Sequence, residues 1–359
     1  MNASTPLKLV SAKFFIRTLS GAVLAAAVLA GCSAPDSGPA GSAGAQPAGT
    51  VRGPGTSTVQ NPGTPHELTA VPPKPGVVLP PPAALTPVPG TAASAGQGVW
   101  RAAGRLVHGR HVVYVTTLIP PGGRTPAGIA WMDTGLLSAR LYSGSVSPGG
   151  GPYKYTAPIQ PTQAATLVAA FNGGFKMANA RGGYYTDGRT IFPLRRGAAS
   201  LVIYADGSVN IGAWGTDVTM TSTVVSVRQN LKPLVIDGKP SSLTRTRDFL
   251  RAWGNTLPAL RHQWRSGAGI TADGALVYVT GPALSPEQLA DLLVRAGAVR
   301  GMQLDINPYW TVFVSYDPAT PGGLAAPANG SKLLPQTTQG PATFFTSWWA
   351  RDFITMSAR

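Results

Sequence analysis

Short apolar runs, separated by glycine, proline, asparagine and aspartate, dominate the chain from Val99 onward. Apolar runs of roughly four to eight residues that are bounded by turn-forming residues are typical of β-strands. The pattern therefore predicts strands throughout this region. These strands are expected at His111–Thr117, Gly128–Met132, Leu167–Phe171, Ser200–Tyr204, Lys232–Ile236, Ala275–Thr280, Gly301–Leu304 and Trp310–Ser315.

One segment has instead the pattern of an amphipathic helix. Ser285, Pro286 and Gln288 supply an N-cap residue, a proline at the first helical position and the N3 residue of a capping box. Leucines then recur at helical spacing until Gly297, and glycine is the residue type that commonly follows the end of a helix. The sequence therefore predicts a helix that starts after Ser285 and ends before Gly297.

Turn signals and shorter helices complete the pattern. Aspartate-glycine pairs at Asp206, Asp237 and Asp273 lie between apolar runs, where such pairs predict hairpin turns. Two shorter helices are expected near Thr162–Thr166 and Arg245–Trp253. Because strands outnumber helices, we predict an α+β fold, a mixed β-rich sheet domain with few helices, over residues 99–359.

The N-terminal region has the pattern of an export signal. Three basic residues precede an apolar run, Leu19–Ala30, which is too short to span a bilayer comfortably. The run ends in Leu29-Ala30-Gly31-Cys32, which resembles the lipobox of bacterial lipoprotein precursors. The resemblance implies a signal peptide over residues 1–31 and lipidation of Cys32, the only cysteine of the chain. A secretory signal without lipidation, or an uncleaved anchor, is the alternative.

Residues 32–98 are rich in proline, glycine, alanine, serine and threonine and carry few charges. Such a segment buries too little apolar surface to offset the entropy lost on ordering, so we predict a disordered tether. With a lipid on Cys32, the tether would hold the following domain on the outer face of the bacterial cytoplasmic membrane.

Basic residues are in excess over acidic ones. The whole chain has 29 Lys and Arg against 14 Asp and Glu, and the part from Arg101 onward has 24 against 12. Outside a membrane, such a domain attracts anionic polymers, phospholipid headgroups or phosphorylated glycans. The export signal argues against nucleic acid as a partner. A basic surface that only keeps the protein soluble is the alternative.

The loop after the strand at Leu167–Phe171 is the first candidate site. Asn172, Gly173 and Gly174 follow the strand directly, and Asp187 lies shortly afterwards. Glycines let the backbone turn sharply and let a ligand approach closely, and polar residues on a loop held by a scaffold often bind or catalyse. A tight turn with incidental polar residues is the alternative.

Two further clusters contain chemically useful side chains. Arg265 is followed by small residues, which would let its guanidinium lie against the backbone and point into a cleft. Asp305 and Asn307 follow the strand at Gly301–Leu304 and alternate along an extended segment, so their side chains share one face. A buried acid is costly unless it is paired, so a structural Asp–Arg pair is the alternative for Asp305.

These clusters, in this order, resemble the phosphodiester glycosidase domain family. The matching segments are Asn172-Gly173-Gly174-Phe175, Asp187-Gly188, Arg265 to Gly269, the capped helix from Ser285, and Leu304-Asp305. The resemblance covers most of residues 99–359 and implies hydrolysis of a sugar-1-phosphate diester at the glycosidic carbon. It implies that Asp187 and Asp305 act as acid, base or nucleophile, and that Asn172, Gly173, Gly174, Arg265 and Asn307 bind substrate.

The sequence therefore predicts a membrane-tethered, exported hydrolase acting on a phosphate-linked glycan or another anionic envelope polymer. This hypothesis requires Asn172, Asp187, Arg265 and Asp305 to converge on one pocket. The sequence after Asp305 lacks the glycine run of the family, which motivates the alternative of a non-catalytic, glycan-binding lipoprotein. A solute-binding lipoprotein of a transporter is a third hypothesis.

We expect neither a metal nor another cofactor. The four histidines, His66, His108, His111 and His262, lack the spacing of metal ligands, and the single cysteine cannot form a cysteine cluster. A calcium site formed by carboxylates is left as an alternative, because such a site needs no histidine or cysteine.

Overall fold

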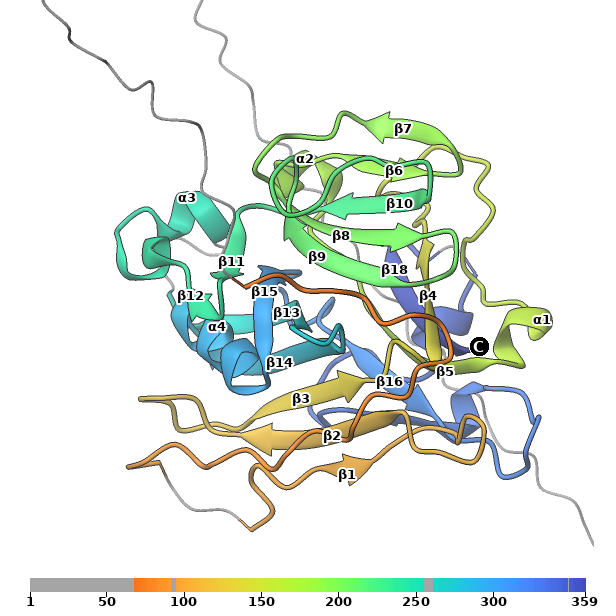
Figure 1. The fold of residues 1–359 in the computed structure, drawn as a ribbon, viewed down its shortest axis with the longest axis horizontal. Coiled ribbons are helices and arrows are strands. Elements are labelled where there is room, and N and C mark those ends of the chain that lie inside the picture. The colour runs from red at the N-terminus through yellow and green to blue at the C-terminus, as the bar shows by residue number, and fades with distance from the viewer. Residues whose placement is uncertain (1–67, 92–94, 255–260, 348) are drawn as a thin grey trace, which may run out of the picture. The chain divides into compact units, whose positions relative to one another are not determined.

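The computed structural model describes residues 68–91, 95–254, 261–347 and 349–359 (Figure 1). The chain divides into two compact units, of which the second, Gln60–Arg359, holds all the described residues. The predicted signal peptide over residues 1–31, its lipidation site Cys32 and the first half of the predicted tether lie outside the described residues.

Three antiparallel sheets make up this unit, which confirms the β-rich α+β class. The largest, the eight-stranded sheet, has the order β1 (Arg101–Ala102), β2 (Val113–Leu118), β3 (Ala127–Met132), β14 (Leu276–Leu284), β13 (Gln263–Thr271), β15 (Ala298–Gln303), β11 (Pro233–Ile236), β12 (Lys239–Pro240). Neighbouring strands pair antiparallel throughout this order.

The two smaller sheets have five strands each. The hairpin sheet has the order β7 (Arg189–Phe192), β6 (Tyr184–Thr186), β10 (Val224–Gln229), β8 (Ala199–Tyr204), β9 (Val209–Ala213). The C-terminal sheet has the order β17 (Gly330–Lys332), β16 (Phe313–Tyr316), β5 (Leu167–Asn172), β18 (Phe353–Ala358), β4 (Leu137–Tyr142). Strand β18 therefore pairs on both sides, with β5 and with β4.

Each strand expected from the sequence overlaps a strand of the structure, and the expected hairpin turns occur. The Asp237-Gly238 turn joins β11 to β12, and both of its residues have positive φ, of 50° and 68°. That geometry matches the right-handed twist of the flanking strands, which is why aspartate-glycine pairs favour two-residue hairpins. The pairs at Asp206 and Asp273 likewise join β8 to β9 and β13 to β14.

The helices are few, as the sequence predicts. Helix α4 (Pro286–Arg295) follows Ser285, whose side chain accepts from the N–H of Gln288, while the Gln288 side chain accepts from the N–H of Ser285. This reciprocal capping box is confirmed. The other helices are α1 (Pro161–Ala164), α2 (Met177–Ala180) and α3 (Phe249–Trp253), with 3-10 turns at Ser242–Arg245, Pro327–Asn329 and Thr343–Phe345.

The second part of the predicted tether differs from the expectation. Ala70, Leu79 and Val88 are buried in the main hydrophobic core. The backbone is also held, because the N–H of Leu79 donates to the carboxylate of Asp133 at 3.1 Å. The physical reason is that scattered apolar residues can fill grooves on a preformed sheet surface even where they cannot build a core of their own. The packed unit thus begins before Val99.

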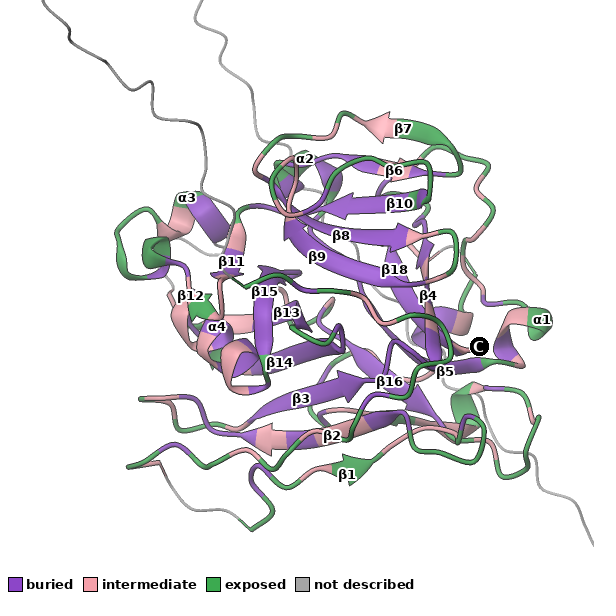
Figure 2. Ribbon diagram, viewed as in Figure 1, coloured by how far each residue is buried: buried purple, intermediate pink, exposed green. Residues whose placement is uncertain are grey.

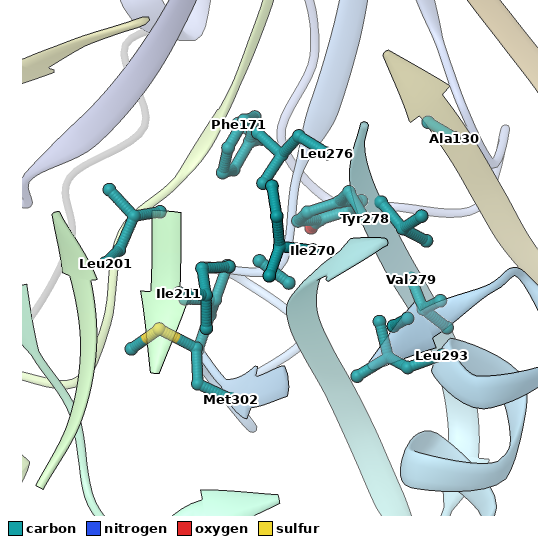
Figure 3. Close-up of a cluster of buried hydrophobic side chains, with 14 of the residues drawn as sticks. Ala130, Phe171, Leu201, Ile211, Ile270, Leu276, Tyr278, Val279, Leu293 and Met302 are labelled. Carbon is teal, nitrogen blue, oxygen red and sulfur yellow. The ribbon is translucent and has the colours of Figure 1, made fainter. Parts of the chain in front are cut away.

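Side chains from all three sheets meet in one hydrophobic core, part of which is drawn in Figure 3. Figure 2 shows that the inner strands β3, β5 and β15 are wholly buried, whereas the edge strand β1 is exposed and β7 has no buried residue. Leu293 of α4 packs into this core beside the eight-stranded sheet (Figure 3). The labelled core residues are Ala130, Phe171, Leu201, Ile211, Ile270, Leu276, Tyr278, Val279, Leu293 and Met302.

Candidate functional site

Asn172 closes strand β5, and its amide is fully engaged by the protein. Its Oδ1 accepts from the hydroxyl of Tyr278 at 2.7 Å and from the N–H of Val312 at 3.1 Å. Its Nδ2 donates to the carbonyl of Gly173 at 2.7 Å and to the Oγ of Ser266 at 3.0 Å. Asn172 therefore joins β5 to β13 and β14, and it orients the loop that follows.

The two glycines of this loop allow close approach of the protein itself. A Cβ on Gly173 would lie 2.0 Å from Oδ2 of Asp352, and one on Gly174 would lie 2.7 Å from Oδ1 of Asn230. Such distances are far inside van der Waals contact, so only glycine fits at either position. The space that the glycines were predicted to leave for a ligand is filled by buried polar side chains.

A buried ion pair anchors those side chains. The Nε of Arg228 donates to Oδ2 of Asp352 at 2.7 Å, and its Nη2 donates to Oδ1 at 3.2 Å. The two side chains are 1% and 0% exposed. Arg228 also donates to the carbonyls of Phe175 and Gln229. This bidentate pair ties β10 of the hairpin sheet to the residue before β18, beneath the Asn172 loop.

Asp305 lies two residues after the end of β15 and is buried. Its Oδ1 accepts from the N–H of Ile306 at 2.8 Å and from the N–H of Asn307 at 3.0 Å, which fixes the turn after the strand. Its own N–H donates to the Oγ of Ser266, the same atom that accepts from Asn172. Asn172 and Asp305 thus belong to one hydrogen-bonded network, with Ser266 between them.

Arg351 is the partner of Asp305. Its Nη2 lies 2.5 Å from Oδ2 of Asp305 and also donates to the carbonyl of Gly174 at 2.7 Å. The guanidinium carbon lies 4.9 Å from the ring centroid of Trp310, which is a cation–π distance. Among the described residues, the Nε of Arg351 has no hydrogen-bond partner. The Asp–Arg pair that the sequence left as an alternative is therefore present.

Burial is the dominant influence on the carboxyl of Asp305. Desolvation raises its pKa, and the charge of Arg351 together with the N–H groups of Asn307 and Ile306 opposes that rise. The net direction is upward, because a carboxylate with 3% residue exposure has lost most of its hydration. A carboxyl with a raised pKa can exchange protons nearer to neutral pH.

These groups open onto a pocket of about 600 Å³, called here the Asp305 pocket. Its volume is in the usual range of small-molecule sites. Three cationic side chains and one carboxylate line it, so its electrostatic character suits an anion. The polar and aromatic side chains in its lining are Phe175, Lys176, Asn179, Arg181, Asp305, Asn307, Trp310 and Arg351.

Aromatic rings gather beside Arg351 at this pocket. Trp310 contacts Tyr309 and Trp349 edge to face, with ring centroids 4.8 and 5.2 Å away. Tyr309 is 46% exposed. Aromatic faces next to charged groups can pack against the apolar face of a sugar ring while the charges bind its polar substituents. The pocket thus combines an acid, cations and aromatic surface.

Arg265 does not line the Asp305 pocket. It lies within β13 and is 0% exposed. Its Nε donates to the carbonyl of Leu284 at 2.8 Å and its Nη1 to Oε1 of Gln303 at 2.6 Å, while Nη2 donates to the carbonyl of Arg261 at 3.2 Å. Burial lowers the pKa of Arg265 to about 9. The structure therefore places it as a buried cross-strand connector and not in a cleft.

Asp187 does not line the Asp305 pocket either. It forms the turn between β6 and β7 with Gly188, and both residues have positive φ, of 52° and 71°. It is exposed, and its Oδ2 accepts from the N–H of Lys154 at 2.8 Å. Asp187 lines a different groove from Asp305. The two aspartates are thus not brought together in one site.

The structure brings together part of the predicted set. Asp305 and Asn307 line the Asp305 pocket, and Asn172, Gly173 and Gly174 support its floor through Ser266 and Arg351. Arg351, Lys176 and Arg181 were not predicted as site residues. Lys176 carried a usable signal, since it follows the Asn172 loop directly; Arg351 has no local motif, because it lies 46 residues from its partner.

Neither a metal cluster nor a membrane-spanning helix occurs among the described residues. Within them, no three His, Cys, Asp or Glu side chains come together as ligands for a metal ion. No helix in the same part of the chain is long and apolar enough to cross a bilayer.

Residues 165–305 match the family model of the phosphodiester glycosidases, which confirms the resemblance expected from the motifs. No curated protein sequence matches the chain.

Several solved structures are similar in part. The catalytic domain of zebrafish N-acetylglucosamine-1-phosphodiester α-N-acetylglucosaminidase, auto-inhibited by its pro-peptide, is 15% identical, with 72% of this chain and 87% of that chain covered and a TM-score of 0.42. A hypothetical protein from Synechocystis is 11% identical (69% and 62% covered, TM-score 0.35). A Burkholderia pseudomallei protein described as exported is 13% identical (65% and 74% covered, TM-score 0.34).

Proposed function

We propose that this chain, whose residues 165–305 match the family model of the phosphodiester glycosidases, hydrolyses a sugar-1-phosphate diester in the Asp305 pocket. The observation that carries the proposal is a buried carboxyl of raised pKa in a pocket that also presents three cationic side chains and an aromatic face. As expected from the N-terminal sequence, we propose that the enzyme is exported and tethered by a lipid on Cys32.

The cations of the pocket would bind the phosphate. Lys176 and Arg181 are exposed, and Arg351 lies at the buried end beside Asp305. Arginine pairs with phosphate oxygens through parallel charge-assisted hydrogen bonds, and lysine adds a mobile point charge. A phosphate held between Arg351 and the two exposed cations would place the attached sugar carbon near Asp305, with Trp310 available to the sugar ring.

A phosphate leaving group reduces the need for a general acid in the enzyme. When the bond between the glycosidic carbon and oxygen breaks, the oxygen leaves on a phosphate monoester, whose second pKa is about 6. Such a group departs as an anion without a strong acid, provided that cations neutralise its charge. This is why one carboxylate near the cations is sufficient here, although glycosidases acting on ordinary glycosides use two.

Asp305 would then act as the base. Its carboxylate takes a proton from water as the water oxygen bonds to the sugar carbon, and the carbon–oxygen bond to phosphate breaks. The products are a free sugar and a phosphate monoester. Binding of the substrate phosphate by Arg351 would draw the guanidinium from Oδ2 of Asp305 and leave that oxygen available to water. The raised pKa brings the base nearer to neutral pH.

The alternative is a non-catalytic protein that binds the same class of glycan. One observation favours it: both carboxylate oxygens of Asp305 are occupied, Oδ1 by two N–H groups and Oδ2 by Arg351. In that case the Asp305 pocket would bind a sugar phosphate without turning it over.

The decisive experiment is an assay with UDP-N-acetylglucosamine, which contains a sugar-1-phosphate linkage, in water enriched in ¹⁸O. Cleavage at the glycosidic carbon places the label in the released sugar, whereas cleavage at phosphorus places it in the phosphate. The variant Asp305→Asn is expected to lose at least about a hundredfold in kcat, the usual contribution of a general base. Asp291→Asn, a helix-surface change, is the matched control.

The outcomes separate the hypotheses. Undiminished turnover in Asp305→Asn would overturn the assignment of the base, and an Asp187→Asn variant tested alongside it would show whether the other aspartate acts instead. Saturable binding without turnover by the wild-type protein, reduced in Lys176→Gln, would establish the binding protein. Label in the phosphate would exclude glycosidic cleavage.

A further inference from the structure

A second groove, of about 700 Å³, lies between β4 of the C-terminal sheet and the hairpin sheet. It is lined by three tyrosines, Tyr155, Tyr185 and Tyr204, and by charged side chains above an apolar floor; we call it the tyrosine groove. The floor includes Leu141 and Ile203. None of its lining residues also lines the Asp305 pocket.

Tyr155 is held firmly in this groove. Its carbonyl accepts from the N–H of Ser143 at 3.0 Å, and the next residue, Thr156, donates from its hydroxyl to the carbonyl of Ser143 at 3.0 Å. Its ring packs against Tyr142 with centroids 5.5 Å apart. The ring therefore has a fixed position before any ligand arrives, and a binding surface that is fixed in advance loses less entropy on binding.

Two cations converge on that ring. The guanidinium carbon of Arg140 lies 5.2 Å from the ring centroid of Tyr155, and the Nζ of Lys154 lies 5.5 Å from it. Within the described part of the chain, neither side chain forms an ion pair or a hydrogen bond, so both charges are available to a ligand.

Cationic side chains outnumber acidic ones in the lining of the groove, with Arg140, Lys154 and Arg359 against Asp187 and Asp206. Asp187 accepts from the N–H of Lys154, and Asp206 accepts from the N–H of Ser208 at 2.8 Å and from its hydroxyl at 2.6 Å. Both carboxylates thus serve to hold turns. Asp187 thus has a structural role in the groove, because it positions the segment that carries Lys154 and Tyr155.

We propose that the tyrosine groove is a second binding site, for an acidic glycan whose sugars carry carboxylate or phosphate groups. The C–H face of a pyranose ring would pack on Tyr155, while Arg140 and Lys154 bind the acidic substituent through charge-assisted hydrogen bonds. The site does not depend on hydrolysis in the Asp305 pocket.

The test is a binding titration of the purified protein with three size-matched oligosaccharides. Oligogalacturonate supplies carboxylates, phosphorylated dextran supplies phosphates, and neutral dextran supplies neither. The double variant Arg140→Gln/Lys154→Gln is compared with Arg110→Gln/Lys239→Gln, which removes the same charge from exposed positions outside the groove. We expect the groove variant to bind the preferred acidic glycan at least about tenfold more weakly, since one charge-assisted hydrogen bond is worth about a tenfold step.

The control variant should bind within about twofold of the wild type, as expected for exposed charges distant from the ligand. A Tyr155→Ala variant should weaken binding as well, and thermal unfolding of each variant shows that it is folded. An equal loss of affinity in both double variants would mean that only the net charge of the protein matters, and it would overturn the proposed site. Neutral dextran binding as tightly as the acidic glycans, or loss in Lys176→Gln in place of the groove variant, would also overturn it. Because binding is measured, the result stands whether or not the protein hydrolyses sugar phosphates.

Discussion

Replacing Asp352 by asparagine should destabilise the protein severely, because it breaks the buried pair with Arg228. Asparagine keeps the shape of the side chain but removes its charge. Arg228 is 1% exposed and would keep only neutral acceptors, the carbonyls of Phe175 and Gln229. Removing one partner of a buried ion pair leaves an uncompensated charge and costs about 3–5 kcal/mol.

The same substitution at an exposed pair provides the comparison. Asp291 pairs with Arg295 on α4 at 2.7 Å, but these side chains are 29% and 32% exposed. A helix-surface pair of this spacing contributes about 0.3–0.5 kcal/mol. The two distances are alike, since Arg228 and Asp352 also approach to 2.7 Å, so the expected tenfold difference in cost comes from burial and not from geometry.

Urea unfolding, followed by circular dichroism, measures both costs. The midpoint should fall far more for Asp352→Asn than for Asp291→Asn, with similar slopes for the two variants. Adding Arg228→Met to Asp352→Asn should restore part of the stability, because it removes the unpaired charge. Equal costs for the two aspartate variants, or a double variant less stable than the sum of its single changes, would refute this reasoning.

Three further predictions concern the Asp305 pocket and the N-terminal segment. Burial raises the pKa of Asp305, so its carboxyl favours the folded state when protonated; that contribution is complete below the unfolded pKa of about 4 and is lost as the pH rises through the folded value. The unfolding free energy of the wild type relative to Asp305→Asn should therefore decline from pH 4 to pH 7 in denaturant titrations, and a rise would contradict the direction. Asn172→Ala should lower the unfolding free energy by at least about 2 kcal/mol in the same assay, because the hydroxyl of Tyr278 and the N–H of Val312 lose their acceptor in the interior. A decrease below about 0.5 kcal/mol would show that water replaces the amide. Gly274→Ala should expose the segment of residues 68–79 to limited proteolysis, since the added Cβ would lie 2.5 Å from a proline of that segment. Gly188→Ala is its control: φ is positive there too, at +71°, but nothing lies within 4 Å, so equal cleavage in both variants would assign the effect to backbone strain alone.

The sequence was most informative where structure is decided locally. Apolar runs between turn formers predicted strands correctly, and the Ser285 cap predicted α4 to within a residue. Strand β13 was missed because its glycines and polar residues resemble a loop. A Cβ on Gly267 would lie 2.9 Å from the carbonyl of Met302, and one on Gly269 would lie 2.6 Å from the Cβ of Ala298. These glycines are required by close packing against β15, which no local pattern indicates.

In the candidate site, too, local features could be predicted from the sequence, whereas features set by tertiary packing could not. Asp305 was recognisable because an acid directly after an apolar strand needs a partner, but the partner, Arg351, is set by tertiary structure alone. Asp187 had the local signature of a hairpin turn, the same aspartate-glycine pair that correctly predicted turns elsewhere, and the structure places it in such a turn. Arg265 was expected in a cleft because small residues follow it, but those residues serve strand packing.

The position of β18 has a consequence for how the protein is made. This strand, Phe353–Ala358, inserts between β5 and β4, which precede it by about two hundred residues of chain. Until it is synthesised, β4 and β5 have no common partner and each presents an open edge. The residues directly before it, Arg351 and Asp352, supply the counter-charges for Asp305 and Arg228. A nascent or truncated chain that stops short of them therefore has neither a closed sheet nor a neutralised site, and completion of the sheet and assembly of the pocket become a single late event.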